Sequence, residues 1–329
     1  MRKSIALVWG GYSSEIIVSA KSMEGVYSFL DKSRYDVYKV RLTKEEWSVD
    51  VDGQLYPVDK NDFSFTDRNS GKKIKFDYAF IIIHGTPGED GRLQSYFDML
   101  SIPYCTCGMM ASALTFDKYI CNNFLRNFGF RVADSCLLRE GQTCDPDAII
   151  GRLGLPVFVK PSIGGSSFAT TKVKTQEELI PAIEIAFKEA NEVVIESFIK
   201  GREVTCGCYK VEGKEVKLPL TEVVTTNEFF NYEAKYEGQV EEITPARISD
   251  ELTKEIQRQT LRIYDIIGAK GIIRADYIIP EDEKPFLLEV NTVPGMTPTS
   301  FIPQQVAAAG LNITDVLTEI IEDELNKNR

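Results

Sequence analysis

Histidine and long apolar segments are nearly absent from this 329-residue sequence. The single histidine, His84, cannot build a multi-histidine zinc site or an H-E-x-x-H hydrolase, so any metal ion would need oxygen or thiolate ligands. No stretch approaches the ~20 apolar residues of a membrane span. The apolar run at residues 5–9 is also shorter than the ~7 to 15 apolar residues of a secretion signal. We therefore expect a cytoplasmic protein without a membrane partner.

Basic residues are outnumbered and do not cluster. The 38 Lys and Arg residues against 49 Asp and Glu give a formal net charge of −11. Nucleic-acid binders gain much of their affinity by neutralising backbone phosphates, so this balance argues against nucleic acid as a partner. The seven cysteines include no C-x-x-C pair, which favours buried, reduced thiols over a zinc site or a disulfide framework. The chain length suggests two or three domains.

The N-terminal part has the order of an α/β unit. Residues 5–9 form an apolar run typical of a buried parallel strand, Gly10 and Gly11 provide a turn, and a helix follows. A second apolar strand at 78–83 leads into the glycine-rich loop 84–91, and functional loops lie at such strand ends. The glycine pair lacks the further glycines of G-x-G-x-x-G, so it is a weak sign of a nicotinamide dehydrogenase, which remains an alternative. The apolar face of the helix is predicted to comprise Ile16, Ala20, Met23, Tyr27 and Leu30.

After residue 117 the chain alternates shorter elements. The pattern predicts helices at 117–128 and 146–153 and strands at 132–138, 155–161 and 168–173. The loop 162–167 between the last two strands is rich in glycine and serine, and the chain has no G-x-x-x-x-G-K-[ST] string. Such a loop can still cover phosphates, because its N–H and hydroxyl groups reach anionic oxygens. An ordinary hairpin turn is the alternative.

A hairpin near the end of the chain carries acids on apolar strands. Its predicted strands are 271–279 and 286–291. Because side chains alternate along a strand, Arg274 and Asp276 share one face of the first strand. Glu289 and Asn291 share a face of the second in the same way.

The register of this hairpin decides what the acids meet. If Ile279 lies opposite Phe286, the carboxylates of Asp276 and Glu289 face each other. Facing carboxylates repel unless a cation or proton lies between them, and oxygen ligands without histidine suit Mg²⁺. The alternative is a polar face exposed to water, on which Arg274 neutralises the acids.

Seven strings in order along nearly the whole chain resemble the D-alanine–D-alanine ligase family of the ATP-grasp superfamily. They are GGYSSEIIVS (10–19), HGTPGEDGRLQ (84–94), MASALTFDK (110–118), LGLPVFVKPSIGGSS (153–167), NYEAKY (231–236), RADY (274–277) and LLEVNTVPGMTPTSFIP (288–303). The resemblance implies an α/β (α+β) protein of three-domain ATP-grasp architecture. The implied units are an N-terminal parallel-sheet α/β substrate domain at 1–117, a central ATP-grasp subdomain at 118–200, and a C-terminal ATP-grasp subdomain with the metal and substrate site at 201–329.

The resemblance also implies a reaction. ATP, held between the central and C-terminal units, phosphorylates the carboxylate of one D-alanine, and the amino group of a second D-alanine attacks the acyl phosphate. The product, D-alanyl-D-alanine, serves peptidoglycan synthesis. The implied cofactors are ATP and two Mg²⁺ ions, with Mn²⁺ as a substitute, and the implied assembly is a homodimer. A D-alanine–D-lactate ligase, another ATP-grasp ligase and a nucleotide-binding protein without activity are the alternatives; Tyr236 favours the dipeptide.

Roles for individual nucleotide and metal ligands follow from the same resemblance. Lysines that match those neutralising ATP phosphates are Lys118 and Lys160, with Lys235 near the phosphate. Residues that match the adenine and ribose contacts are Glu196, Ile199 and Glu203. Residues that match the magnesium ligands are Asp276, Glu289 and Asn291.

Substrate and catalytic roles are implied in the same way. Glu15 matches the acid that holds the first substrate's ammonium group, and with it Ser166 and Tyr236 order the loop over the site. Arg274 and the Gly295 N–H match the pair that stabilises the oxyanion. Residues implied near the substrate carboxylates are His84, Lys235, Ser300 and Phe301.

Three positions depart from the family pattern. Ile16 and Phe301 stand where relatives often have arginine and leucine, and Ala169 stands where the loop often has glycine. None of the three belongs to the implied metal or phosphate ligands.

Overall fold

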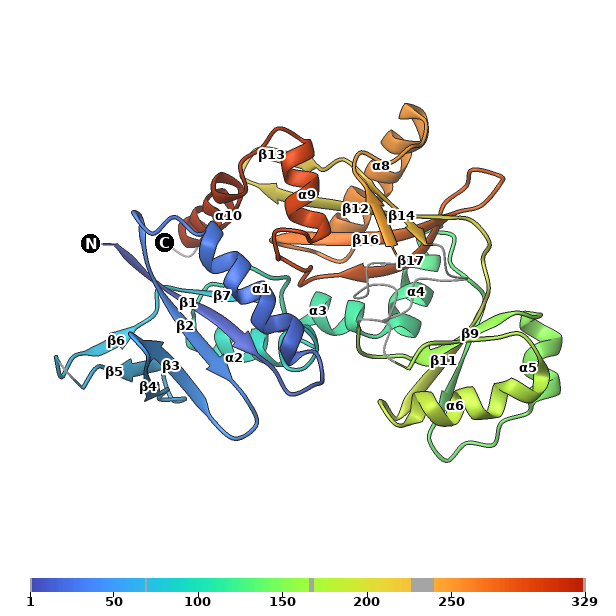
Figure 1. Ribbon diagram of the computed structural model, residues 1–329, viewed down its shortest axis with the longest axis horizontal. Coiled ribbons are helices and arrows are strands. Elements are labelled where there is room, and N and C mark those ends of the chain that lie inside the picture. Colours follow the sequence, from blue (N-terminus) through green and yellow to red (C-terminus); the bar gives the residue numbers. More distant parts are fainter. Residues whose placement is uncertain (1, 69, 166–168, 226–239, 328–329) are drawn as a thin grey trace.

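The computed structural model describes residues 2–68, 70–165, 169–225 and 240–327. Figure 1 shows three bodies, an N-terminal one that contains β1 and α1, a central one that contains β9 and α6, and a C-terminal one that contains β12 and β16. Helices and strands occur in all three, as the α/β prediction requires.

The N-terminal body is built on a five-stranded sheet in the order β4-β3-β2-β1-β7. β1 pairs in parallel with β2 and β7, whereas β3 and β4 pair antiparallel. The sheet is therefore mixed, because short hairpins join β2, β3 and β4 and only antiparallel strands allow such turns. The strands are β1 (Lys3–Gly10), β2 (Tyr35–Leu42), β3 (Trp47–Val51), β4 (Gln54–Pro57) and β7 (Tyr78–Ile81), with β5 (Ser64–Thr66) and β6 (Lys73–Lys75) in a separate pair. The helices are α1 (Ile16–Phe29), α2 (Arg92–Leu100) and α3 (Met109–Phe116).

The buried face of α1 differs from the predicted apolar stripe. Met23 and Leu30 are buried as expected, but the remaining predicted positions are only partly covered. Ser19 lies inside instead, and its Oγ donates to Ile82 O at 2.7 Å. A Cβ on Gly25 would lie 2.2 Å from Met296 O. Close approach to backbone therefore selects small side chains on this face, a constraint that apolar periodicity does not reveal.

The central body has its own four-stranded antiparallel sheet in the order β10-β9-β11-β8. Its apolar core contains residues of these strands and of its helices, including Val157, Leu179 and Ile195. The predicted hairpin of β9 and β10 is confirmed. The elements are β8 (Ser135–Arg139), α5 (Pro146–Leu153), β9 (Val157–Pro161), β10 (Thr171–Val173), the 3₁₀ helix Gln176–Glu178, α6 (Leu179–Phe187) and β11 (Glu192–Ser197).

The C-terminal body contains a six-stranded sheet in the order β15-β14-β12-β16-β17, with β13 also paired to β12. The strands are β12 (Arg202–Val211), β13 (Lys214–Lys217), β14 (Thr221–Thr225), β15 (Val240–Ile243), β16 (Ile272–Ile279) and β17 (Phe286–Asn291). The helices are α8 (Asp250–Ile266), α9 (Phe301–Ala308) and α10 (Ile313–Lys327). Ser249 caps α8 by accepting a hydrogen bond from Leu252 N at 3.2 Å.

The hydrophobic cores group two helices differently from the predicted domain limits. Ile320 and Ile321 of α10 belong to the core of the N-terminal body, and Tyr35 Oη donates to Glu322 Oε1 at 2.7 Å. Cys121 and Leu125 of α4 (Lys118–Arg126) belong to the core of the C-terminal body. The limits at 117/118 and 200/201 stay a prediction. Among the described residues, the core of the central sheet comes from that unit alone, whereas the other two cores combine residues from both sides of a predicted limit.

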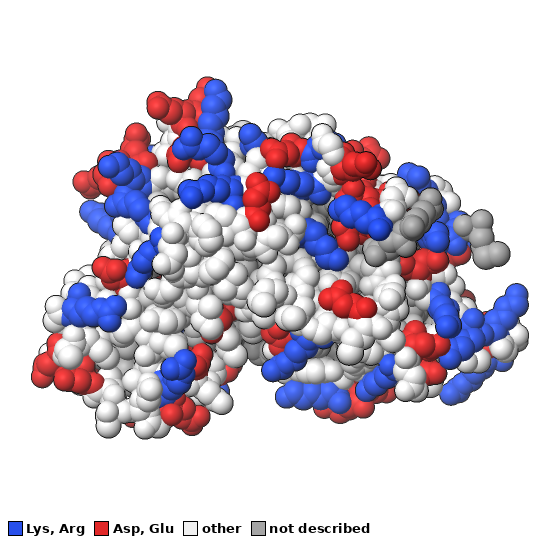
Figure 2. Space-filling view, turned by 180° about the vertical axis from the view of Figure 1, so that it is seen from behind, with Lys and Arg blue, Asp and Glu red and all other residues white. Residues whose placement is uncertain are grey.

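One face of the molecule can be compared with the prediction that basic residues do not cluster. On the face in Figure 2, acidic and basic side chains are interspersed, and a broad area with few charges crosses its middle. Within the described ranges, no helix combines the length and the apolar character needed to cross a bilayer.

Candidate active site

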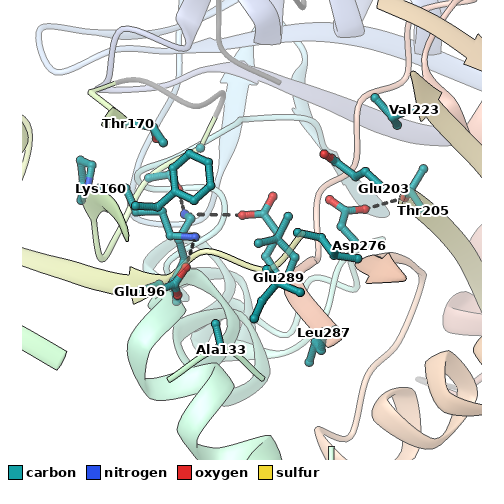
Figure 3. Close-up of a pocket in the computed structure, with 18 of the residues that line it drawn as sticks. Ala133, Lys160, Thr170, Glu196, Glu203, Thr205, Val223, Asp276, Leu287 and Glu289 are labelled. Atoms are coloured by element: carbon teal, nitrogen blue, oxygen red, sulfur yellow. Dashed lines mark hydrogen bonds and ion pairs between the residues drawn. The ribbon is translucent and has the colours of Figure 1, made fainter. Parts of the chain in front are cut away.

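A cleft of about 800 Å³ opens where the three bodies meet. Glu15 of the N-terminal body, Lys160 and Glu196 of the central body, and Asp276 and Glu289 of the C-terminal hairpin all line it. Figure 3 shows these last four side chains around one space, with Lys160 against Glu196 and Asp276 against Thr205. Charged groups that are far apart in sequence therefore share one enclosure.

The register of the carboxylate hairpin brings the predicted pair together. Asp276 lies opposite Glu289, which confirms the predicted pairing of the two acids. The predicted register at the turn was wrong, because Phe286 pairs with Ile278 and not with Ile279. A register shift between residues 276 and 277 compensates for the difference.

Asp276 is the centre of a hydrogen-bond network. Arg274 Nε donates to its Oδ1 at 2.8 Å and Arg274 Nη2 to its Oδ2 at 2.7 Å. Thr205 Oγ1 donates to Oδ1 at 2.5 Å. Burial disfavours a charged guanidinium, but the Asp276 carboxylate outweighs this and raises the pKa of Arg274. The polar-face alternative therefore fails, because both side chains are about nine-tenths covered.

The donor set fits a magnesium ion by its chemistry. Asp276, Glu289 and Asn291 supply carboxylate and amide groups within one network, since Asn291 Nδ2 donates to Asp276 Oδ2 at 3.1 Å and to Glu289 Oε1 at 3.4 Å. Turning that amide by half a turn would present its oxygen to the same space. In the part of the chain that the structure describes, no group of three or more His, Cys, Asp and Glu residues gathers to hold a metal. Few protein ligands are what Mg²⁺ needs when phosphates supply the rest.

Two lysines reach the cleft from different elements. Lys160 Nζ lies 2.7 Å from Glu196 Oε2, and both side chains are nearly covered. Lys118, at the start of α4, donates to Gly164 O, and its Nζ lies 3.8 Å from Glu289 Oε2. Asp117 fixes the start of that helix by accepting from Ile120 N at 2.9 Å. Both ammonium groups are thus held where an anion in the cleft could meet them.

Aromatic side chains form the wall next to the lysines. The rings of Phe158 and Phe198 lie 5.9 Å apart, and Lys172 Nζ lies 4.0 Å from the Phe198 ring centroid. Ile199 and Glu203, the predicted adenine and ribose residues, line the same cleft. Sequence reasoning assigned no role to Phe158, although an aromatic residue inside a strand before a glycine loop was available as a signal.

Glu15 lines the cleft from the N-terminal body, and two glycine loops enclose it. It directly precedes α1 and is buried. A Cβ on Gly85 or on Gly165 would lie 2.9 Å from its carboxylate oxygens, so two glycine loops close on this side chain. His84 is buried beside them, with its Nε2 at 3.1 Å from Ser22 Oγ, and it is not part of the cleft lining. Its contact with a substrate carboxylate stays a prediction.

Glu89 is a titratable group that sequence reasoning missed. Its Oε2 accepts from Gly85 N at 2.7 Å, so it stabilises the loop that encloses Glu15. Burial, and then the charge of Glu15, raise the pKa of Glu89 to about 8. The signal was present in the sequence as an acid inside the glycine-rich loop 84–91.

We expect Glu89 to make the stability of the unliganded protein depend on pH. Its pKa is raised from 4.5 to about 8 in the folded state. The stabilising contribution is therefore complete below pH 4.5 and is lost as the pH rises through about 8. Thermal unfolding between pH 6 and 9 should show a steeper loss of stability for the wild type than for Glu89→Gln. The exposed turn residue Glu281 provides the control, and equal slopes for Glu89→Gln, Glu281→Gln and the wild type would contradict the assignment.

The loop after β17 folds back onto the hairpin. Ser300 Oγ accepts from Thr297 N at 3.0 Å, and a Cβ on Gly295 would lie 3.0 Å from that same Oγ. Phe301 lines the cleft, and its ring centroid lies 5.2 Å from Arg274 Cζ. The aromatic residue at this departure position therefore packs on the guanidinium. Ser166, Lys235 and Tyr236 lie outside the described residues.

Comparisons with known proteins point to one family. The family model "D-ala D-ala ligase N-terminus" matches residues 4–107, and "D-ala D-ala ligase C-terminus" matches residues 124–322. A protein named D-alanine--D-alanine ligase from Parabacteroides distasonis is 62% identical, over 100% of this chain and 99% of its own length. One of the same name from Bacteroides fragilis is 59% identical, over 98% of this chain and 100% of its own length.

Solved structures agree over the same length. D-alanyl-alanine synthetase A from Vibrio cholerae superposes with a TM-score of 0.89 at 28% identity, covering 99% of each chain. VanG D-Ala:D-Ser ligase from Enterococcus faecalis gives 0.86 at 30% identity, over 98% of this chain and 99% of its own. A Bacillus anthracis D-alanine--D-alanine ligase complexed with ATP gives 0.78 at 30% identity, over 99% of this chain and 98% of its own. The three-body ATP-grasp fold is thus confirmed.

Proposed function

Because this chain belongs to the D-alanine–D-alanine ligase family, we propose that the cleft residues described above perform the family's reaction in the roles given below. The protein is an ATP-dependent ligase that joins two D-alanine molecules to D-alanyl-D-alanine for peptidoglycan synthesis. The observation that carries this conclusion is identity of 54–62% along the full chain to proteins that all bear that name, which also disfavours the D-lactate alternative.

The chemistry explains why the cleft gathers cations around carboxylates. A free carboxylate is a poor electrophile, so the first D-alanine needs activation before an amine can attack it. Its oxygen attacks the γ-phosphorus of ATP, an O–P bond forms, and ADP leaves. The amine of the second D-alanine then attacks the carbonyl carbon, a C–N bond forms, and phosphate leaves. Negative charge develops at each step, which positioned donors and cations stabilise.

For the nucleotide, we assign the central wall of the cleft. Phe158 and Phe198 would hold the base, and Lys118 and Lys160 would exchange their carboxylate contacts for phosphate oxygens. Glu196 and Ile199 would contact adenine, and Glu203 would bind the ribose hydroxyls. Lys235 would lie near the phosphate.

Magnesium is assigned to the hairpin on the basis of its donors. Asp276, Glu289 and Asn291 would hold two ions, with Glu289 shared between them and Mn²⁺ as a substitute. Bound there, the metal would screen the phosphate charges and stabilise the group being transferred.

For the substrates, we assign two groups of residues in and beside the cleft. Glu15 would bind the ammonium group of the first D-alanine, where two glycine loops lie close to its carboxylate. Arg274 and the Gly295 N–H would stabilise the oxyanion formed by the second attack. Ser300 would bind the carboxylate of the second D-alanine next to Gly295, with Phe301 as the wall.

Assembly and location are part of the same proposal. We propose a homodimer in the cytoplasm, on the strength of the family. Sedimentation at micromolar concentration tests the assembly, and a monomer of 37.0 kDa would contradict it.

The reaction is tested by one assay with several substrates. The protein is incubated with ATP, Mg²⁺ and D-alanine, L-alanine, or D-alanine together with D-lactate, and both phosphate release and the product are measured. We expect phosphate and D-alanyl-D-alanine in equal amounts with D-alanine, and neither with L-alanine. Formation of D-alanyl-D-lactate instead of the dipeptide when both are supplied would assign the chain to the ester-forming relatives, and no phosphate release with any substrate would exclude a ligase.

A further inference from the structure

Gln305 lies on α9 behind the cleft and is wholly buried. Its Oε1 accepts from Gly207 N at 3.0 Å. Its Nε2 donates to Thr205 O at 3.0 Å and to Thr221 Oγ1 at 3.1 Å. No water is needed to satisfy these groups, so the amide has one orientation and a shorter or apolar side chain would leave buried polar groups unmatched.

The two residues of β12 that bond to Gln305 lie opposite Asp276 and Arg274 on the neighbouring strand β16. Thr205 lies opposite Asp276, and Gly207 lies opposite Arg274. Thr205 also donates its hydroxyl to Asp276 Oδ1 at 2.5 Å. One amide therefore ties α9 to the strand behind both Arg274 and Asp276.

α9 packs against this strand without space for adjustment. A Cβ on Gly207 would lie 2.5 Å from Ile302 Cδ1 and 2.7 Å from Gln305 Oε1. The helix begins at Phe301, directly after Ser300. A shift of α9 along the strand would therefore move Ser300 relative to Arg274.

The third hydrogen bond extends the contact to β14. Thr221, the first residue of β14, has its Oγ1 at 2.6 Å from Thr244 Oγ1, and Thr244 directly follows β15. These two strands precede and follow residues 226–239, which contain Lys235. The same amide is thus linked to both strands that flank this segment.

We propose that Gln305 is a positioning residue for the second D-alanine, an inference that rests on the ligase function proposed above. It fixes the start of α9, and with it Ser300, at a set distance from Arg274. Gln305 has no contact with the elements that carry Glu15, Lys118 or Lys160 in its hydrogen bonds. The Thr205 hydroxyl keeps its own hydrogen bond to Asp276 when Gln305 is replaced, so we expect the loss of Gln305 to affect the second substrate more than ATP or the first D-alanine.

The test separates the two half-reactions. Gln305→Met keeps the length of the side chain and removes the three hydrogen bonds. We expect the KM for the second D-alanine to rise about tenfold, while the KM values for ATP and the first D-alanine change less than about twofold. Hydroxylamine provides a probe independent of the second site, because its nitrogen attacks the acyl phosphate carbon and displaces phosphate. D-alanyl hydroxamate should therefore form at the wild-type rate in the variant.

Gln257→Met is the matched control. Gln257 Nε2 donates to Leu218 O at 2.9 Å in the same body. This hydrogen bond does not involve α9, so the variant should keep all three KM values. If Gln305→Met does not fold, Thr221→Val is the variant that tests the proposal. It removes one hydrogen-bond acceptor of Gln305 with little change of shape, and it should raise the KM for the second D-alanine by a smaller factor. Equal loss of dipeptide and hydroxamate, or an unchanged second KM, would overturn the inference. A wild type that forms neither product would instead overturn the proposed function itself.

Discussion

Asp276→Asn is expected to lower turnover at least about 1,000-fold, which corresponds to about 4 kcal/mol of transition-state stabilisation. Asparagine has nearly the same shape and can still accept from Thr205, but it removes the charge that neutralises Arg274. The substitution also removes one of the two facing carboxylates that we assign to magnesium. Phosphate release with ATP, Mg²⁺ and D-alanine measures the effect.

Stability must be followed with the same variant. Breaking a buried ion pair by removing one partner costs about 3–5 kcal/mol, because the other charge stays buried. Thermal unfolding therefore distinguishes lost chemistry from lost fold. Asp282→Asn is the control. Asp282 lies in the turn of the same hairpin and forms an ion pair with Arg131 at 2.9 Å. Both side chains are about half exposed, and such pairs contribute about 0–1 kcal/mol to stability. Turnover of folded Asp276→Asn equal to that of Asp282→Asn would remove Asp276 from the site.

The hairpin shows how far strand periodicity alone leads. The limits of β17 are the predicted ones, and the alternation of side chains predicted that Asp276 faces Glu289. The predicted register was wrong by one residue at Phe286, but the register shift next to Asp276 brings Asp276 opposite Glu289 as predicted. Periodicity fixes which face a side chain takes, but an irregularity in the ladder depends on packing that the sequence does not display.

Contacts between distant segments could not be predicted. Thr205 and Gln305 stand in apolar stretches without a motif, and only the packing of α9 on β12 brings them to the hairpin. The position of the C-terminal helix α10 could not be predicted either. Its apolar face predicts that it is buried, but not that it packs into the core of the N-terminal body. The family resemblance supplied candidate roles for single residues. The geometry added Glu89 and the Phe301 ring against Arg274.

Arg274→Lys is the second variant with a large expected effect. Lysine keeps one positive charge near Asp276 but loses the planar fork that now makes two hydrogen bonds to it, and it cannot pack flat on Phe301. Arg131→Lys is the control, because Arg131 lies before β8 and packs against the same hairpin, with its Cζ 4.1 Å from the Phe286 ring centroid, outside the hydrogen-bond network of Asp276. It should keep wild-type rates of both ADP and dipeptide formation.

The step that slows in Arg274→Lys identifies what Arg274 does. If its guanidinium stabilises the oxyanion of the second attack, loss of that donor should slow dipeptide formation about 100- to 1,000-fold. ADP formation in a single turnover should slow much less, because the phosphate contacts that we propose for Lys118 and Lys160 would remain. Rapid-quench measurement of ADP and dipeptide would then show ADP appearing in a burst before the product. ADP and dipeptide slowed by the same factor would place Arg274 at phosphoryl transfer instead, because the first step would then limit both.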